Sequence, residues 1–158
     1  MIKLEAITNL YRGDGLKIST KGRYGIKALI DLVMNSENES VTLKTISKRQ
    51  NISERYLEQI FSALRKSGII IGRKGAQGGY TLAKDPKEIT ISEILRVLEG
   101  ESLLVDISND GVDELESFIN ENLWKGINDK INEYFKSITL QDLVDKYQLS
   151  KEGIIYYI

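Results

Sequence analysis

A polar face runs along residues 53–67 with the spacing of one side of an α-helix, and it consists of Arg55, Gln59, Ser62 and Lys66. Arginine can donate two hydrogen bonds to guanine and glutamine can pair with adenine, so this face suits the base edges of a DNA groove. The opposite face is apolar and predicts the side that packs into a core: Leu57, Ile60, Phe61 and Leu64. Any solvated amphipathic helix shows such a pair of faces, so the neighbouring elements must decide its role.

The segments around this helix predict a mainly α-helical, winged helix-turn-helix fold. Thr42 caps a short preceding helix, and Ser53 caps the polar-faced helix, which Gly68 ends. Two short strands are expected at 69–72 and 80–83, joined by a basic, glycine-rich loop that forms the wing. Because this arrangement places one helix in the major groove with its wing beside it, the sequence predicts double-stranded DNA as a partner.

The wing loop, residues 73–79, carries Arg73, Lys74 and Gln77 among four flanking glycines. Glycine lets a backbone approach a phosphate or a minor groove closely, where a cation is attracted by the negative potential. The competing interpretation is a nucleotide phosphate loop. It fails because the G-x-x-x-x-G-K-[ST] spacing is missing and no helix is expected after Gly79.

A first helix is expected from Lys21 to Ser36, with Ser19 or Thr20 as its cap. Hydroxyl and cationic side chains at a helix N-terminus can hold a phosphate. Simple capping with solvated charges is the alternative. The residues concerned are Ser19, Thr20, Lys21, Arg23 and Tyr24.

The second half of the chain predicts a dimerisation helix. After a helix at 90–99 and an acidic loop at 101–113, apolar residues recur every four positions through 114–137. This is more apolar surface than one small domain can cover, so we expect the long helix to pack on a second copy; folding back onto its own domain is the alternative. The expected interface comprises Leu123, Trp124, Ile127, Ile131, Tyr134 and Phe135. Thr139 and Asp142 open a last short helix.

Composition supports a polyanion binder and excludes several chemistries. Residues 16–87 hold 14 Lys and Arg against 6 Asp and Glu, whereas residues 88–158 hold 6 against 15. The basic half would approach DNA and the acidic half would be repelled.

The chain has no cysteine and no histidine, so disulfides, the usual zinc sites, cysteine-ligated iron–sulfur clusters and a histidine base are excluded. We expect no enzyme activity and no cofactor. With no membrane-length or signal-like apolar segment, we also expect a cytoplasmic location.

Several motifs together resemble the Rrf2 family of winged-helix transcription regulators. They are Ser-Thr-Lys-Gly-Arg-Tyr-Gly (19–25), Tyr-Leu-Glu-Gln-Ile-Phe (56–61), Leu-Arg-Lys-Ser-Gly (64–68), Gly-Ala-Gln-Gly-Gly-Tyr (75–80), Ile-Ser-Glu-Ile-Leu-Arg-Val-Leu-Glu-Gly (91–100), Leu-Trp (123–124) and Thr-Leu-Gln-Asp-Leu-Val (139–144). The resemblance implies DNA contacts at Thr20, Lys21, Arg23, Tyr24, Tyr56, Glu58, Gln59 and Lys74, to which the helix and wing geometry adds Arg55 and Gln77. It divides the chain into an extension (1–15), a winged-helix DNA-binding domain (16–100) and an acidic loop, dimerisation helix and tail (101–158).

Many family members hold an iron–sulfur cluster through cysteines before the dimer helix, but residues 106–122 contain none. The chain is most similar to the cluster-free branch of Gram-positive bacteria, which represses genes of cysteine and sulfur uptake and has cysteine synthase as its partner and sensor. That similarity implies a homodimeric repressor on a pseudo-palindromic operator. It also implies that Tyr156, Tyr157 and Ile158 enter the synthase active site or, alternatively, pack on the dimer. There are two other candidates. One is a regulator of the same family that senses a small molecule or stress, and the other is a winged-helix protein that binds only proteins.

Leu16 occupies the position of the family's initiating methionine. Residues 1–15 are therefore interpreted as an extension, either upstream of the natural start or added artificially, and no role is assigned to them.

Overall fold

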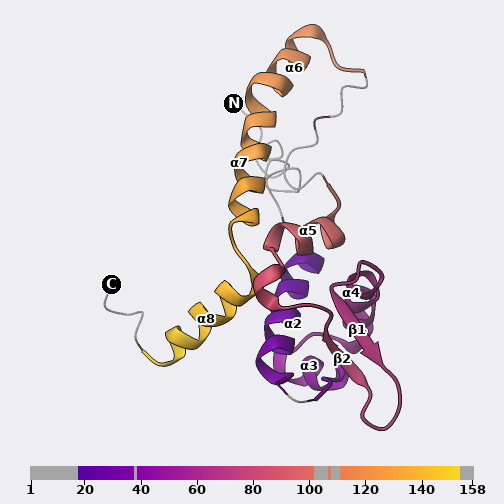
Figure 1. Cartoon of the computed structure of the whole chain (residues 1–158). Helices are drawn as coiled ribbons and strands as arrows, with labels where there is room; N and C mark the ends of the chain where they lie inside the picture. Colours follow the sequence, from indigo (N-terminus) through magenta and orange to yellow (C-terminus); the bar gives the residue numbers. More distant parts are fainter. Residues whose placement is uncertain (1–17, 38, 102–106, 108–110, 154–158) are drawn as a thin grey trace, which may run out of the picture.

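A computed structural model describes residues 18–37, 39–101, 107 and 111–153 of the chain. Its helices and strands are, in order, α2 (Thr20–Asn35), α3 (Leu43–Gln50), α4 (Glu54–Lys66), β1 (Ile70–Arg73), β2 (Gly79–Leu82), η1 (Pro86–Glu88), α5 (Ile91–Glu99), α6 (Glu114–Ile119), η2 (Asn120–Trp124), α7 (Lys125–Lys136) and α8 (Leu140–Lys151). The N-terminal elements form a compact body from which α7 and α6 extend in one direction and α8 in another (Figure 1). Within the described residues, no helix is long and apolar enough to cross a membrane.

The core lies where α2, α3, α4 and α5 meet. The apolar face of α4 predicted from its periodicity is confirmed, since Leu57, Ile60, Phe61 and Leu64 are fully buried. Other elements contribute further buried residues: Ala28, Leu29, Leu32, Ile46, Ile69, Ile89, Ile94, Leu95 and Leu140. Burial of this many large side chains in one cluster fixes the helix-turn-helix against α2 and α5.

Side-chain caps define the starts of the helices. The hydroxyl of Thr42 accepts a hydrogen bond from the Thr45 amide, and Ser53 does the same for Tyr56. Between α3 and α4, Asn51 adopts a left-handed conformation (φ 54°), which closes the tight turn. The predicted helix-turn-helix is thus present, with the start of α3 as expected.

The wing is an antiparallel pair in which Ile70 faces Leu82 and Arg73 faces Gly79. The first strand begins and ends one residue later than predicted, and the second begins and ends one residue earlier. The wing is attached to the chain before α3, because Val41 and Tyr80 exchange two backbone hydrogen bonds of 3.0 and 2.8 Å. Gly79 has φ 148°, and a Cβ there would lie 2.7 Å from the Val41 carbonyl oxygen, so this close approach requires glycine.

The long helix expected at 114–137 contains an irregular turn. A π-helical turn, η2, separates α6 from α7, and its Lys125 amide donates to the carbonyl of Asn120. A strict four-residue apolar repeat drifts about 40° per step around a helix of 3.6 residues per turn. A wider π turn compensates part of this drift, which explains its place in the middle of the apolar repeat. The helix expected over 114–137 is thus confirmed as one continuous helical run from Glu114 to Lys136, and the π turn within it is a feature that the sequence did not predict.

The last helix, α8, begins with the capping box that the sequence predicted. Thr139 accepts a hydrogen bond from the Asp142 amide, and the Asp142 carboxylate accepts one from the Thr139 amide. These hydrogen bonds from Thr139 lower the pKa of Asp142 below its ordinary value. By contrast, the Thr90 and Glu93 pair at the start of α5 forms only half of such a capping box. Thr90 accepts from the Glu93 amide, but the Glu93 carboxylate binds Lys84 at 2.9 Å.

Candidate DNA-binding surface

The polar face of α4 lies at the surface. Arg55, Gln59 and Lys66 are exposed, and Ser62 is half-buried. The Ser53 cap and the buried apolar face fix the rotation of the helix, so these side chains cannot turn inward without breaking the core. Glu58 is also exposed, whereas Tyr56 is half-buried. The first two turns of α4 thus present hydrogen-bond donors and acceptors at the surface.

A pair of tyrosines joins the N-terminal part of α2 to the start of α4. The rings of Tyr24 and Tyr56 meet edge to face, with centroids 5.8 Å apart. Two residues expected at the DNA from separate segments are therefore in contact. Thr20 and Arg23, on the same end of α2, are exposed, and Lys21 is half-buried.

The N-terminus of α2 is capped from within the chain. The Glu99 carboxylate, at the end of α5, accepts hydrogen bonds from the Ser19 amide (3.0 Å), the Ser19 hydroxyl and the Gly22 amide (3.1 Å). An internal carboxylate therefore takes the place that a bound phosphate would occupy at this helix end. The Ser19 and Gly22 amides are therefore already engaged by Glu99, and the side chains around the N-terminus are the groups best placed for a phosphate contact.

Gly22 makes this cap possible. A Cβ at position 22 would overlap the Glu99 carboxylate oxygen, so only glycine lets the carboxylate come this close. One turn further along α2, a Cβ at Gly25 would overlap Leu98. The backbone of α2 therefore packs directly against a side chain of α5. The orientation of the α2 N-terminus thus depends on α5.

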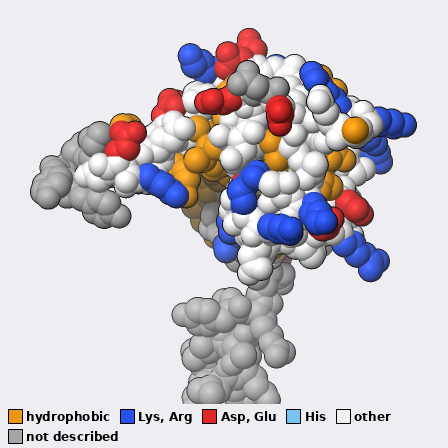
Figure 2. Space-filling view, turned by 90° about the horizontal axis from the view of Figure 1, so that it is seen from below, with side chains coloured by type: hydrophobic (Ala, Val, Ile, Leu, Met, Phe, Trp, Pro, Cys, Tyr) orange, Lys and Arg blue, Asp and Glu red, His pale blue; other side chains and the backbone are white. Residues whose placement is uncertain are grey.

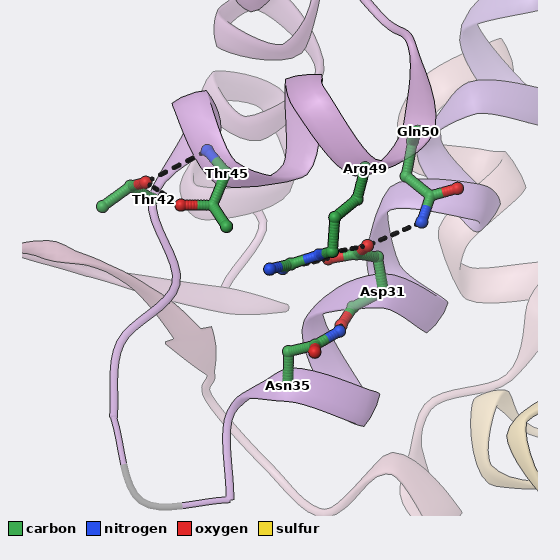
Figure 3. A network of polar contacts seen from close by, with 6 residues as sticks. All are labelled: Asp31, Asn35, Thr42, Thr45, Arg49 and Gln50. Atoms are coloured by element: carbon green, nitrogen blue, oxygen red, sulfur yellow. Dashed lines mark hydrogen bonds and ion pairs between the residues drawn. The ribbon is translucent and has the colours of Figure 1, made fainter.

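A buried carboxylate holds the first helix of the helix-turn-helix to α2 (Figure 3). Asp31, whose side chain is 1% exposed, accepts from Arg49 Nε at 2.9 Å and from a terminal nitrogen of Arg49 at 2.6 Å. Gln50 donates a further hydrogen bond of 2.6 Å to Oδ2, the oxygen that also accepts from Arg49 Nε. The hydrogen bond to Asp31 raises the pKa of Arg49, and the carboxylate charge adds to this, although desolvation opposes it. Arg49 therefore stays charged, and its guanidinium, which is 34% exposed, pairs with a carboxylate that is buried.

The wing lies beside the helix-turn-helix. The Phe61 and Tyr80 rings pack edge to face at 5.0 Å, which attaches β2 to α4. Lys74 and Gln77 are exposed on the wing loop, and the Gln77 carbonyl accepts from the Ser40 hydroxyl. Seen from the end of the molecule that carries α3 and the wing, Lys and Arg side chains are spread over much of the surface (Figure 2). This is the charge distribution that attracts a phosphate backbone.

Comparison with known proteins fits this geometry. A family model described as "Rrf2: Iron-dependent Transcriptional regulator" matches residues 18–146. The chain is 39% identical over 143 residues to the HTH-type transcriptional regulator CymR of Bacillus subtilis (strain 168), covering 90% of this chain and all of the relative. The chain belongs to the Rrf2 family. It is accordingly a winged-helix, DNA-binding transcriptional regulator and not an enzyme.

A second relative and a solved structure extend this comparison. The transcriptional regulator IscR of Escherichia coli O9:H4 is 36% identical over 138 residues, covering 85% of this chain and 83% of the relative. The solved structure of CymR, the global cysteine regulator of B. subtilis, superposes with a TM-score of 0.71 at 41% identity, covering 83% of this chain and 98% of that one. The mainly helical winged-helix fold predicted from the sequence is confirmed by this likeness.

The iron in the family description does not fit this chain. Cysteine and histidine are absent from the whole sequence, so no cysteine-ligated cluster can form. In the part of the chain that the structure describes, no three carboxylates come together in a way that could hold a metal ion. This family member therefore differs from an iron-dependent regulator in its donor atoms.

The structure places the predicted dimer residues along the arm formed by η2 and α7. Leu123 and Tyr134 are exposed, at 48% and 63%. Trp124, Ile127, Ile131 and Phe135 are half-buried. Tyr156, Tyr157 and Ile158, the predicted partner-binding tail, lie outside the described residues.

Sequence reasoning missed Glu99 and the Asp31–Arg49–Gln50 network. Asp31 gave a signal, because it interrupts the apolar run Ala-Leu-Ile-Asp-Leu-Val at 28–33, and a carboxylate in a core-facing run needs a partner. Glu99 gave none, since it lies 80 residues from Ser19 in the chain.

Proposed function

We propose that the chain acts as a homodimer that binds a pseudo-palindromic operator and represses genes of cysteine and sulfur metabolism. The observation that carries the DNA-reading part is the rigid, outward-facing polar face of α4, held by the buried apolar face behind it. Similarity to CymR supports the choice of regulon. A DNA-binding regulator acts at the chromosome, so the proposed location is the cytoplasm.

Within this proposal, the side chains divide by the part of the DNA they touch. Arg55 and Gln59, one turn apart near the N-terminus of α4, contact base edges, while Tyr56 and Glu58 flank them. At the end of α2, Thr20, Lys21, Arg23 and Tyr24 contact phosphates. The wing adds Lys74 and Gln77 at the adjacent backbone or minor groove.

The homodimer is supported by apolar side chains on the arm. Leu115, Phe118, Leu123 and Tyr134 are exposed to 67%, 62%, 48% and 63%. They lie on α6, η2 and α7, which project from the body (Figure 1). Large apolar side chains exposed on a projecting arm favour an interface, and a second copy of the same arm supplies a matching surface. In this scheme residues 16–100 read DNA and residues 101–158 pair the subunits.

A matched pair of variants tests the dimer. Leu123→Glu places a charge in the proposed interface, whereas Leu149→Glu places one on α8 at a similar exposure of 42%. Light scattering after gel filtration should give a dimer for the natural chain and for Leu149→Glu, and a monomer for Leu123→Glu. A dimer that survives Leu123→Glu, or a natural chain that is monomeric, contradicts the proposed arm interface.

The regulon and the partner rest on the resemblance to cysteine-metabolism repressors. A gel-shift assay with promoter DNA of sulfur genes, against unrelated promoter DNA of equal length, tests the regulon. Deletion of Ile158 tests cysteine synthase as the partner, because the proposed contact places this side chain and the terminal carboxylate in the synthase active site. Unchanged affinity for the synthase after this deletion contradicts the tail contact while leaving DNA binding unaffected.

A further inference from the structure

A cavity of about 570 Å³ lies between α2, α3 and α8, beside the network that fixes α3 to α2. Its charged lining comes from Lys27, Asp31, Arg49 and Lys151, and its uncharged polar lining from Asn35, Gln50 and the Tyr147 hydroxyphenyl group. In Figure 1, α8 leaves the body beside α2, with α3 below. The cavity is large enough for a small organic molecule and is separate from the exposed face of α4.

The charges around this cavity favour an anion. Among the described residues that line it, the one carboxylate is that of Asp31, which already accepts from both Arg49 and Gln50. Lys27 donates to the Gln50 carbonyl at 3.1 Å, and Lys151 lies 5.1 Å above the Tyr147 ring. Among the described residues, neither lysine pairs with a carboxylate. Since an ammonium group has three donor hydrogens, both lysines retain donors for a ligand.

The remaining lining favours an organic body behind the anionic group. Ile30 and Met34, on α2, present apolar side chains to the cavity, and Tyr147 presents a ring from α8. A bare inorganic ion would leave this apolar surface in water, whereas a flat hydrocarbon or aromatic body would cover it. We propose that this cavity binds a small organic carboxylate, with its charged end toward Lys27, Arg49 and Lys151 and its apolar body against the Tyr147 ring.

Binding here would act on the helix-turn-helix. Arg49 connects α3 to α2 through Asp31, as Figure 3 shows, so a ligand carboxylate near Arg49 competes with Asp31 for the guanidinium. A ligand that favours one arrangement of α2 and α3 changes DNA affinity, and DNA changes ligand affinity by the same factor. This consequence rests on the proposed DNA-reading function, whereas the binding site itself does not.

Benzoate is the probe, because it combines one carboxylate with a flat ring. It is titrated into the full-length, ¹⁵N-labelled chain without DNA, at constant ionic strength, and backbone amide shifts are followed. We expect saturable shifts at Ile30, Arg49 and Tyr147. Benzamide, the neutral analogue, should bind about tenfold more weakly because it loses the charge-assisted hydrogen bonds.

Two lysines on the same helix provide a matched pair of variants. Lys151→Ala should weaken benzoate binding about fivefold, the effect of one exposed ion pair. Lys146→Ala, also exposed on α8 but outside the cavity lining, should leave it unchanged. Equal effects of the two substitutions would show unspecific attraction and overturn the proposal.

Three other results would also overturn it. They are the absence of saturable shifts, shifts centred on α4 in place of the cavity, and binding of inorganic phosphate at the cavity as tight as that of benzoate. The last result would assign the cavity to a simple phosphate such as that of the DNA backbone. Because the titration contains no DNA, failure here is distinguishable from failure of the DNA-reading proposal.

Discussion

Replacement of Asp31 by alanine tests whether the buried ion pair holds the helix-turn-helix together. The Asp31 side chain is 1% exposed, and the substitution removes four hydrogen bonds between 2.6 and 3.2 Å: three from Arg49 and one from Gln50. The substitution leaves the Arg49 guanidinium and the Gln50 side-chain amide without the carboxylate that accepts their hydrogen bonds. The loss falls on the contact between α2 and α3 and not on a surface charge.

The expected magnitude follows from the burial of the two partners. Removing one member of a fully buried ion pair costs about 3–5 kcal/mol. Arg49 is 34% exposed, so water can partly replace the lost carboxylate. We therefore expect the free energy of unfolding to fall by about 2–3 kcal/mol, between the value for a charged hydrogen bond and that for a buried pair. For a chain of 158 residues this corresponds to a fall in Tm of about 5–10 °C.

Urea unfolding followed by circular dichroism measures this difference, with Asp145→Ala as the matched control. Asp145 is exposed and accepts one hydrogen bond from Gln141, so its removal should cost less than about 0.5 kcal/mol. Comparing Asp31→Ala and Arg49→Ala with the double variant isolates the pair, and its coupling energy should reach about 1 kcal/mol or more. A coupling energy near zero, or equal losses for Asp31→Ala and Asp145→Ala, would refute the reasoning.

Other expectations concern the N-terminal ends of two helices, α2 and α8. Gly22→Ala should lower operator affinity, measured by fluorescence anisotropy, because its Cβ displaces the Glu99 carboxylate that orients α2; an unchanged affinity would show that this cap does not position the DNA contacts. Lys21→Ala should weaken binding to all DNA sequences alike and reduce the salt slope by about 1, whereas a sequence-dependent loss would argue against a phosphate contact. The pKa of Asp142 is lowered in the folded chain, so its contribution to stability is complete above the unfolded value and is lost as pH falls through the folded pKa. Carboxyl NMR shifts should therefore titrate below the ordinary value of 3.8, and the protection of the Thr139 amide relative to its intrinsic exchange rate should be lost only in that acidic range.

The sequence predicted the parts of the fold that depend on local order. The apolar face of α4, the Ser53 and Thr139 caps and the glycine-rich wing are all encoded within a few residues. Periodicity and capping are short-range effects, so their boundaries were predicted to within about a residue. The π turn was not predicted, since an unbroken α-helix and one with a single wide turn give nearly the same apolar pattern.

The contacts that join distant segments could not be predicted from one sequence. Glu99 reaches the Ser19 amide across 80 residues, and no spacing rule relates the two positions. Glu93 occupies a capping-box position, yet its carboxylate binds Lys84 because the folded chain brings that cation close. Local sequence patterns predict which side chains can cap a helix or form an ion pair, but the tertiary packing determines the partner that each side chain binds.

The most direct test of the DNA-reading surface is the affinity of Arg55→Ala and Gln59→Ala for an operator found by genomic footprinting, relative to a scrambled duplex of the same composition. Arg96→Ala, an exposed arginine on α5, is the control. The two α4 variants should each lose about 1–3 kcal/mol of specific binding and relax the preference for individual base pairs, whereas the control should keep both. Retention of full operator preference by both α4 variants would show that another surface reads the bases.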